Sequence, residues 1–418
     1  MSVGVSSPDP DAHLLNIVAR CYAEGAALGV MVSGGGDSMA LLHLLHRLAA
    51  PQGLRIEATT IDHGLRAGAR AEAEMVAAFC STRGIPHQIS LWQHGKIAGN
   101  LMDEARRARY QMAEAWAVAR GLTQIAVGHT ADDQAETFLI GLSRQAGIDG
   151  LSGMRKVWGQ GGLTFTRPLL SIPREDLRDY LRRHGIQWAD DPSNADSQYT
   201  RVKARNALAT LAPLGITATV LAAVSDNLET ARQALVQQVQ TAAQSVSQTG
   251  AGTLRIPRAG FLHQPQEIQR RLLITALRWI SGAGYPPRES GLMAVQTAIA
   301  AQKDATLGGV RFKTKADTIY ILREAKAVQS LACPTTQLWD NRWQMSGPHA
   351  ANLTIRALGA DGLSLCGDWR SLGIPRDALL VTPAVWQDQT LIAAPIAGFS
   401  NGWQAFPAVS FGSFVLSH

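Results

Sequence analysis

Residues Val30 to Leu42, which read VMVSGGGDSMALL, place a glycine-rich loop between an apolar run and a second apolar run with helical spacing. This order is typical of a β-strand that passes into a helix N-terminus at the edge of a parallel sheet. Glycines there let backbone N–H groups approach an anion, and the dipole of the following helix favours negative charge. We therefore expect the loop to bind phosphate through Ser33, Gly34, Gly35, Gly36, Asp37 and Ser38. The alternative is a plain turn in which Asp37 or Ser38 caps the helix.

The sequence on both sides of this loop predicts the fold class. Short apolar runs at 28–32, 54–61, 87–92 and 123–127 alternate with amphipathic stretches that begin near residue 38 and span 69–83, 100–120 and 131–144. Strands that alternate with helices in this way form a parallel, doubly wound α/β sheet. We expect this Rossmann-like domain to occupy residues 1–215, followed by a helical middle domain at 216–330 and a small, mostly β domain at 331–418.

Composition and charge narrow the class of protein. The chain has 418 residues, 46% of them hydrophobic and 17% charged, which is ordinary for globular domains. It shows no pattern of a secretory signal at its start and no apolar run near the roughly 18 residues that a membrane span needs. We therefore expect a cytoplasmic protein with no membrane segment. The net charge of +6 is compatible with a polyanionic partner such as nucleic acid.

Four cysteines lie far apart in the sequence, at Cys21, Cys80, Cys333 and Cys366, with no C-x-x-C pair among them. This spacing indicates neither a disulfide framework nor a zinc or iron–sulfur site. We expect buried free thiols instead.

The loop itself is S-G-G-x-D-S, which lacks the lysine of a P-loop and the G-x-G-x-x-G pattern of dinucleotide folds. It resembles the PP-loop of the ATP pyrophosphatases, which adenylate a substrate oxygen with ATP and release pyrophosphate. An ordered set of further motifs makes the chain similar to the tRNA(Ile)-lysidine synthetases, and the likeness spans most of its length. These motifs are IDHGLR at 61–66, EARRARY at 104–110, GHTADDQAET at 128–137 and DPSN at 191–194.

The resemblance implies an activity and its partners. Synthetases of this family use ATP and Mg²⁺ to join free L-lysine to C2 of the wobble cytidine in the CAU anticodon of tRNA(Ile), through an adenylated tRNA. The middle and C-terminal domains are then expected to contact the tRNA. Two alternatives are weighed against this activity. A tRNA thiolase is disfavoured because the chain has no C-x-x-C pair, and an idle ATP- and RNA-binding protein is disfavoured because the loop and acidic motifs are intact. The sequence does not decide between a monomer and a homodimer.

Nucleotide contacts are expected at the ends of the first two strands. Asp37 is the candidate ligand of Mg²⁺, and Asp62 and His63 lie where the second strand ends, on the rim of the same crevice. A simple strand-to-helix turn with local hydrogen bonds at Asp62 explains that pair equally well.

The stretch HTADDQAET places Asp132, Asp133 and Glu136 in the first turns of a helix, where spacings of three and four bring the carboxylates together. Asp133 and Glu136 are the expected catalytic residues and Asp132 a substrate-binding one, because a lysine amine needs acidic partners. Thr130 and Asp133 also fit a capping box, which explains the acidic residues without catalysis.

Basic residues complete the expected site. Where the family usually shows Arg-Asn followed shortly by another Arg after DPSN, this chain reads RVKARN, so either Arg201 or Arg205 is the family's arginine. Spacing favours Arg201 as the catalytic residue and leaves Arg205 as a substrate contact. Arg106 and Arg109, on the helix of EARRARY, are expected to contact tRNA phosphates, although such charge runs are often only solvated faces.

Overall fold

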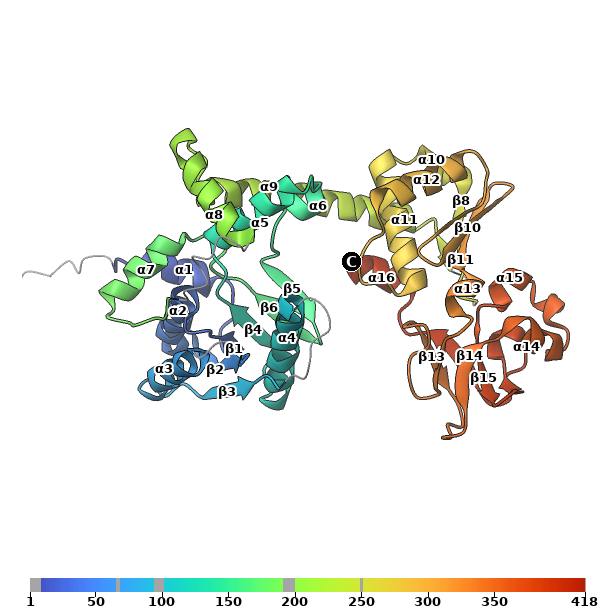
Figure 1. Ribbon diagram of the computed structural model, residues 1–418, viewed down its shortest axis with the longest axis horizontal. Helices are drawn as coiled ribbons and strands as arrows, with labels where there is room; N and C mark the ends of the chain where they lie inside the picture. Colours follow the sequence, from blue (N-terminus) through green and yellow to red (C-terminus); the bar gives the residue numbers. More distant parts are fainter. Residues whose placement is uncertain (1–8, 65–67, 94–100, 191–199, 249–250, 418) are drawn as a thin grey trace, which may run out of the picture. The chain divides into compact units, whose positions relative to one another are not determined.

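Figure 1 shows the computed structural model, which describes residues 9–64, 68–93, 101–190, 200–248 and 251–417. The chain divides into two compact units, Met1–Arg232 and Gln233–His418. Helix α9 (Ala218–Ala243) contains the boundary between them. Leu65, Arg66 and the DPSN motif at 191–194 lie outside the described residues.

The first unit alternates strands and helices for most of its length. Its strands are β1 (Ala27–Met31), β2 (Arg55–Asp62), β3 (His87–Leu91), β4 (Gln124–Val127), β5 (Val157–Gln160) and β6 (Leu163–Thr166). Its helices before α9 are α1 (Ala12–Ala19), α2 (Gly36–Gln52), α3 (Ala69–Ser81), α4 (Leu101–Ala119), α5 (Ala131–Ser143), α6 (Ile148–Leu151), α7 (Arg174–Arg183), α8 (Thr200–Leu211) and the short 3₁₀ helix Ala212–Leu214.

These strands form one six-stranded sheet in the order β3-β2-β1-β4-β6-β5. All neighbours pair in parallel except β5, which runs antiparallel to β6 at the edge. The order reverses between β1 and β4, so the loop after β1 opens at the switch point where ligands bind in such sheets.

Side chains of β1 alternate between two cores, one on each face of the sheet. Leu28 and Val30 join a cluster with α1, α2, α3 and α7, whereas Met31 joins a second cluster with α4 and β6. Figure 1 shows α2 and α3 on one side of the sheet and α4 on the other. At Gly29 an added Cβ would lie 2.6 Å from Trp116, so α4 packs directly on the backbone of β1.

The prediction of a doubly wound α/β sheet is therefore confirmed. Strands β1–β4 and helices α3–α5 begin and end within about two residues of the expected positions, and α2 begins two residues before its expected start, whereas α1 was not expected. The segment after residue 146 has no such alternation of apolar and amphipathic stretches in its sequence. The structure adds β5 and β6 there, and α7 follows them.

The second unit contains three antiparallel sheets. Their strand orders are β7-β8-β11-β10-β9, β12-β14-β15-β16 and β13-β17. The strands are β7 (Ser247–Gln248), β8 (Leu254–Pro257), β9 (Ala305–Leu307), β10 (Val310–Lys315), β11 (Thr318–Arg323), β12 (Ala332–Pro334), β13 (Trp343–Ser346), β14 (Thr354–Ala357), β15 (Pro383–Gln387), β16 (Thr390–Ala393) and β17 (Gln404–Pro407). The helices are α10 (Arg258–His263), α11 (Gln266–Ser281), α12 (Glu289–Ala300), α13 (Ala325–Val328), α14 (Gly359–Leu365), α15 (Arg376–Leu379), α16 (Phe411–Ser417) and the 3₁₀ helices Trp369–Leu372 and Pro395–Ala397.

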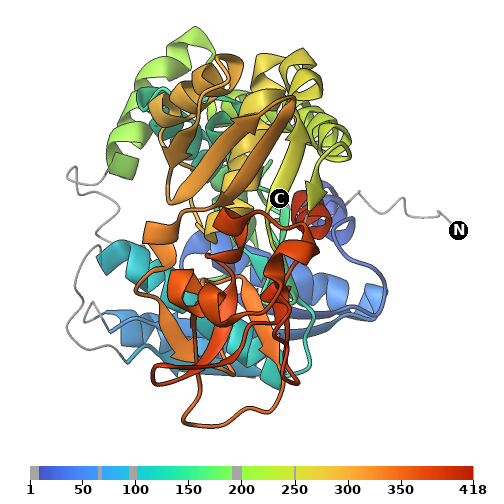
Figure 2. The same cartoon turned by 90° about the vertical axis from the view of Figure 1, so that its right-hand side faces the viewer.

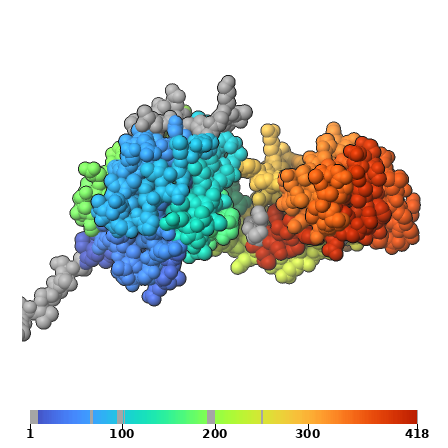
Figure 3. All heavy atoms as spheres, turned by 90° about the horizontal axis from the view of Figure 1, so that it is seen from below, coloured from blue at the N-terminus to red at the C-terminus, as the bar shows by residue number. Residues whose placement is uncertain are grey.

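The middle region combines the expected helices with the five-stranded sheet, which faces the viewer in Figure 2. The chain's last helix, α16, returns to this region, because Phe411 and Val415 join the cluster formed by α11, α12 and the sheet. Arg342, on the turn before β13, donates to the carbonyl oxygens of Ile280 and Gly252 at 3.0 and 2.7 Å. In Figure 3 the orange and red atoms of the C-terminal elements form one continuous surface of the second unit. The division at residues 215 and 330 stays a prediction.

In the described part of the chain, no single helix is long and apolar enough to cross a membrane. Two consecutive helical segments, Thr200–Leu214 and Ala218–Ala243, together have the length and apolar composition of a membrane span. The chain bends by 98° between them. All four cysteines are free thiols, as expected. Cys80 and Cys366 are buried, whereas Cys333 is half-buried and Cys21 is exposed, contrary to the expectation.

Candidate active site

The glycine-rich loop turns from β1 into the N-terminus of α2. Gly34 has φ of +88°, a left-handed conformation that favours glycine, and Gly35 is the N-cap residue without a side-chain cap bond. The hydroxyl of Ser38 accepts from the Ser33 N–H at 3.1 Å and donates to the Gly35 carbonyl at 2.9 Å. The alternative interpretation, in which the side chain of Asp37 or Ser38 caps α2, is therefore wrong. Side-chain hydroxyls close the loop, and α2 begins with backbone N–H groups that suit an anion.

Two neighbouring segments fix the position of this loop. The Gly34 carbonyl accepts from the Ala189 N–H at 2.9 Å. On the other side, Gly128 at the end of β4 approaches α2 so closely that an added Cβ would lie 3.0 Å from the Cα of Ser38. The start of α5, which follows Gly128, is thereby held beside the start of α2.

Helix α5 begins with the capping box that the sequence indicated. Thr130 is the N-cap, its side chain accepts from the Asp133 N–H at 3.5 Å, and Asp133 Oδ2 accepts from the Thr130 N–H at 2.9 Å. The other oxygen of Asp133, Oδ1, faces a guanidinium group at 3.2 Å. Asp133 thus uses one oxygen as a cap and leaves the other for a cationic partner.

That guanidinium belongs to Arg174, the first residue of α7. Its Nε lies 3.0 Å from Asp37 Oδ2, its Nη2 contacts Asp133, and its Nη1 lies 3.7 Å from Glu136 Oε1. The backbone N–H of Arg174 donates to Asp132 Oδ2 at 2.8 Å, so Asp132 serves α7 as a cap. One arginine therefore joins the nucleotide loop to all three acidic residues of α5.

Glu136 has a second basic partner on α8, which packs against α5. Arg205 donates from Nε and Nη2 to Glu136 Oε1 at 3.0 and 2.9 Å, and the Glu136 side chain is only 2% exposed. Arg201 lies one turn earlier on α8 and is exposed, yet its charge helps to lower the pKa of Asp133. The structure thus gives Arg205 the direct contact and Arg201 an electrostatic influence.

Burial and the positive charges nearby shift the pKa values of Asp37 and Asp133 in opposite directions. Burial, helped by the charges of Asp133 and Asp132, raises the pKa of Asp37 to about 6 despite the contact with Arg174. Burial also works to raise the pKa of Asp133, but the charge of Arg174 and the hydrogen bond from the Thr130 N–H favour its charged form, and the net shift is downward. Asp133 is accordingly a stable anion, suited to hold a cation.

His129, at the end of β4, belongs to a different set of contacts. Its Nδ1 accepts from Arg167 Nε at 2.9 Å, and the Arg167 guanidinium lies 3.9 Å from the ring centre of Trp158. Burial, with the charges of Arg167, Arg109 and Arg106, lowers the pKa of His129 to about 3. His129 is therefore neutral near pH 7, with the proton on Nε2.

The remaining predicted residues surround these contacts. Asp62 ends β2, is buried, and accepts from the Gly64 N–H at 2.9 Å, which is the local turn bond that the alternative interpretation required. His63 packs edge-on against Trp92. Arg106 and Arg109 on α4 lie 5.4 and 5.8 Å from the ring centre of Tyr110, and burial together with Arg106 and Arg201 lowers the pKa of Arg109.

Arg174 and Arg167 were not singled out from the sequence. Arg167 lies within the RPLL segment and Arg174 follows Pro173. A cation in the first turn of a helix opposes the helix dipole, so an arginine directly after a helix-starting proline is a signal that acidic partners lie elsewhere in the fold.

The site suits a magnesium ion that is held by one carboxylate together with the phosphates of a nucleotide. Within the described residues, no group of three or more His, Cys, Asp or Glu side chains is arranged to hold a metal ion. Mg²⁺ in nucleotide enzymes, however, is commonly held by one or two carboxylates together with phosphate oxygens and water. Asp37, in the first turn of α2, can supply such a carboxylate.

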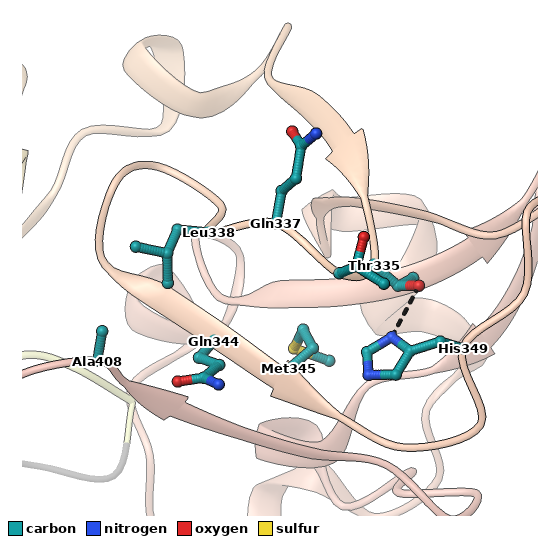
Figure 4. A pocket seen from close by; sticks show the side chains of 8 residues that line it. Thr335, Gln337, Leu338, Gln344, Met345, His349 and Ala408 are labelled. Atoms are coloured by element: carbon teal, nitrogen blue, oxygen red, sulfur yellow. Dashed lines mark hydrogen bonds between the residues drawn. The ribbon is translucent and has the colours of Figure 1, made fainter. Parts of the chain in front are cut away.

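A separate hollow of about 550 Å³ lies in the second unit (Figure 4). Among the described residues, its lining consists of Thr335, Thr336, Gln337, Leu338, Gln344, Met345, His349 and Ala408. A hydrogen bond of 3.0 Å between His349 Nδ1 and the Thr335 hydroxyl orients the imidazole at the edge of the hollow. None of these residues takes part in the cluster around Arg174.

Comparison with known proteins identifies the family. A PP-loop domain family matches residues 10–212. The chain is 46% identical over 378 residues to the tRNA(Ile)-lysidine synthase of Ruegeria pomeroyi, and the match covers 90% of each protein. The chain belongs to the tRNA(Ile)-lysidine synthase family. A second member, from Wolbachia pipientis, is 33% identical and is matched over 78% of both chains.

The PP-loop domain match implies that members of this family use ATP, as the loop after β1 predicts. Among solved structures, the chain resembles the U34-tRNA thiolase NcsA from Methanococcus maripaludis, which was determined with its 4Fe-4S cluster. The two share 16% identity and a TM-score of 0.46 over 52% of this chain and 79% of that one.

Proposed function

We propose that the protein forms lysidine by ligating lysine to C2 of the wobble cytidine in the CAU anticodon of tRNA(Ile), with ATP converted to AMP and pyrophosphate. Family membership supports the reaction, and one observation supports its location: Arg174 joins Asp37 of the nucleotide loop to Asp133 and Glu136 of α5. An ATP site and an acidic site for an amine thus share one cluster.

In the first step, the cytidine O2 attacks the α-phosphate of ATP, pyrophosphate leaves, and an adenylated base forms. The loop from Ser33 to Ser38 holds the phosphates at the N-terminus of α2, where the first backbone N–H groups of the helix point toward the ligand. Mg²⁺, held by Asp37 with phosphate oxygens, would neutralise charge on the leaving pyrophosphate. Asp62 and His63 contact the nucleotide from the end of β2.

In the second step, the ε-amine of lysine attacks C2 and AMP leaves. The amine has an ordinary pKa of about 10.4 and arrives as ammonium, so it must lose a proton before or during attack. Asp133, a stable anion, binds the ammonium beside Glu136, and a carboxylate of this pair or Asp132 accepts the proton. Arg201 and Arg205 stabilise the negative charge of the leaving AMP and contact the substrate.

The tRNA is bound by charge and shape. Arg106 and Arg109 contact phosphates near the anticodon, and the regions 216–330 and 331–418 contact the rest of the tRNA. We propose a cytoplasmic location, where tRNA, ATP and lysine are all present. Light scattering would decide between a monomer and a homodimer.

The test is to incubate the protein with ATP, labelled lysine and total tRNA. Label in one isoleucine tRNA, with AMP and pyrophosphate formed only when tRNA and lysine are both present, is the expected result. Sulfur incorporation would favour a thiolase, and nucleotide binding without AMP formation would favour an idle binding protein.

A further inference from the structure

Arg174 occupies an unusual position for a cation. It begins α7, where the helix dipole disfavours positive charge, and the preceding residue, Pro173, offers no side-chain cap. Four carboxylates compensate: Asp37, Asp133 and Glu136 around the side chain and Asp132 at the backbone N–H. Although burial acts in the opposite direction, Asp37, Asp133 and Asp132 raise the pKa of Arg174, so the guanidinium stays charged.

The guanidinium lies where two ligands of opposite charge would compete for it. Nη2 and Nη1 face Asp133 and Glu136, the pair that would receive the ammonium group of lysine. Nε faces Asp37 in the first turn of α2, the helix end that would receive ATP phosphates. Arginine pairs strongly with phosphate through two parallel hydrogen bonds.

The charges of the cluster indicate the direction of the exchange. In the described structure, the carboxylates of Asp37, Asp133 and Glu136 contact the guanidinium groups of Arg174 and Arg205, and Asp132 adds a fourth negative charge at the Arg174 backbone N–H. Moving Arg174 toward phosphate leaves Asp133 and Glu136 with one cation fewer, which favours binding of another. Arg205 remains on Glu136 from the opposite side, on α8.

We propose that Arg174 is a positioning residue that couples the two substrate sites. ATP phosphates draw its guanidinium away from Asp133 and Glu136, and this opens the carboxylate pair for lysine. The inference rests on the proposed function, because it takes lysine as the cation. Coupling of this kind is reciprocal, so lysine tightens nucleotide binding by the same factor.

The experiment measures lysine affinity by equilibrium dialysis on the full chain, with and without a non-hydrolysable ATP analogue and Mg²⁺. We expect the analogue to tighten lysine binding by about 5- to 150-fold in the unmodified protein, the usual range for coupled sites. In Arg174→Gln, lysine binding without nucleotide becomes tighter and the effect of the analogue falls to within about twofold. Arg174→Lys, which keeps the charge but loses the paired donors, retains part of the coupling.

Arg182→Gln is the matched control, because Arg182 lies on the same helix, is 52% exposed, and pairs in the described structure with the exposed carboxylates of Glu175 and Asp179. It should show the full nucleotide effect. The inference is overturned if the unmodified protein binds lysine equally well with and without the analogue, a measurement that needs no variant to fold. It is also overturned if Arg174→Gln keeps the full effect. Absence of any lysine binding, with or without nucleotide, would instead overturn the proposed function on which this inference depends.

Discussion

Substituting Glu136 by Gln separates catalysis from helix capping better than any change at Asp133. Asp133 belongs to the capping box of α5, so its replacement disturbs the helix start as well as the charge. Glu136 lies one turn further and takes no part in that box, while glutamine has nearly the same size and helix propensity. The change removes one negative charge that faces Arg205 and Arg174.

The structural cost follows from these contacts. Removing one partner of a fully buried ion pair costs about 3–5 kcal/mol, but a glutamine oxygen still accepts hydrogen bonds. The Arg205 side chain is 37% exposed, so water solvates much of its charge once the pair is lost. We expect the free energy of unfolding to fall by about 1–2 kcal/mol, out of the 5–15 kcal/mol typical of folded proteins. Almost all molecules then remain folded.

The expected loss of activity is larger. Losing a positioned acid–base group slows a reaction by about 10²- to 10⁴-fold, which corresponds to about 3–5 kcal/mol. The assay measures single-turnover transfer of labelled lysine to adenylated tRNA, alongside thermal unfolding. Adenylation itself should change little, because Glu136 faces the amine rather than the phosphates in the proposed arrangement.

Glu175→Gln is the control, since Glu175 is a 62% exposed carboxylate on α7 that pairs in the described structure with Arg178 and Arg182 at the surface. It should transfer lysine at the normal rate. Near-normal lysine transfer by Glu136→Gln would refute the assignment of this carboxylate to the amine. A loss of adenylation of equal size would move Glu136 to the nucleotide step.

Three further predictions test the loop, the packing and the charges of the first unit. Gly35→Val should abolish ATP-dependent turnover, because it places a branched side chain where the backbone must approach phosphate. The fold should survive, because the nearest atom to an added Cβ, Ser33 Oγ, lies 3.5 Å away, and turnover at the normal rate would remove the loop from the site. Gly29→Ala should lower the free energy of unfolding by about 1–3 kcal/mol, measured in urea, because the new methyl group would lie 2.6 Å from Trp116. Burial opposes ionisation of Asp11, but hydrogen bonds from His184 and two arginines lower its pKa from 3.8 to about 2. Since the folded pKa is the lower one, Asp11 should stabilise the fold by about 2 kcal/mol above pH 4 and lose this contribution as the pH falls toward 2; Asp11→Asn should remove that part of the acid sensitivity, seen as a smaller difference in urea stability between pH 7 and pH 3.

The sequence by itself determined strands β1–β4, helices α2–α5 and the loop that begins the site. Hydrophobic periodicity is a local property, so residues such as Leu28, Val30 and Ile56 reveal the strand in which they lie without knowledge of their partners. Helix starts are equally local, and the capping box of Thr130 and Asp133 forms as the motif indicated. The order of motifs also sufficed to place the chain in its family.

Only the tertiary structure decided which charges meet. Arg174 and Asp37 are 137 positions apart in the chain, and no local pattern links them. The choice between Arg201 and Arg205 was likewise open, because spacing in a sequence does not say which face of α8 packs against α5, and the packed helices bring Arg205 onto Glu136. Ion pairs of this kind form only where separate elements come together at the switch point of the sheet. The burial of apolar side chains on both faces of the sheet decides that arrangement, and the sequence neighbours of each charged residue do not.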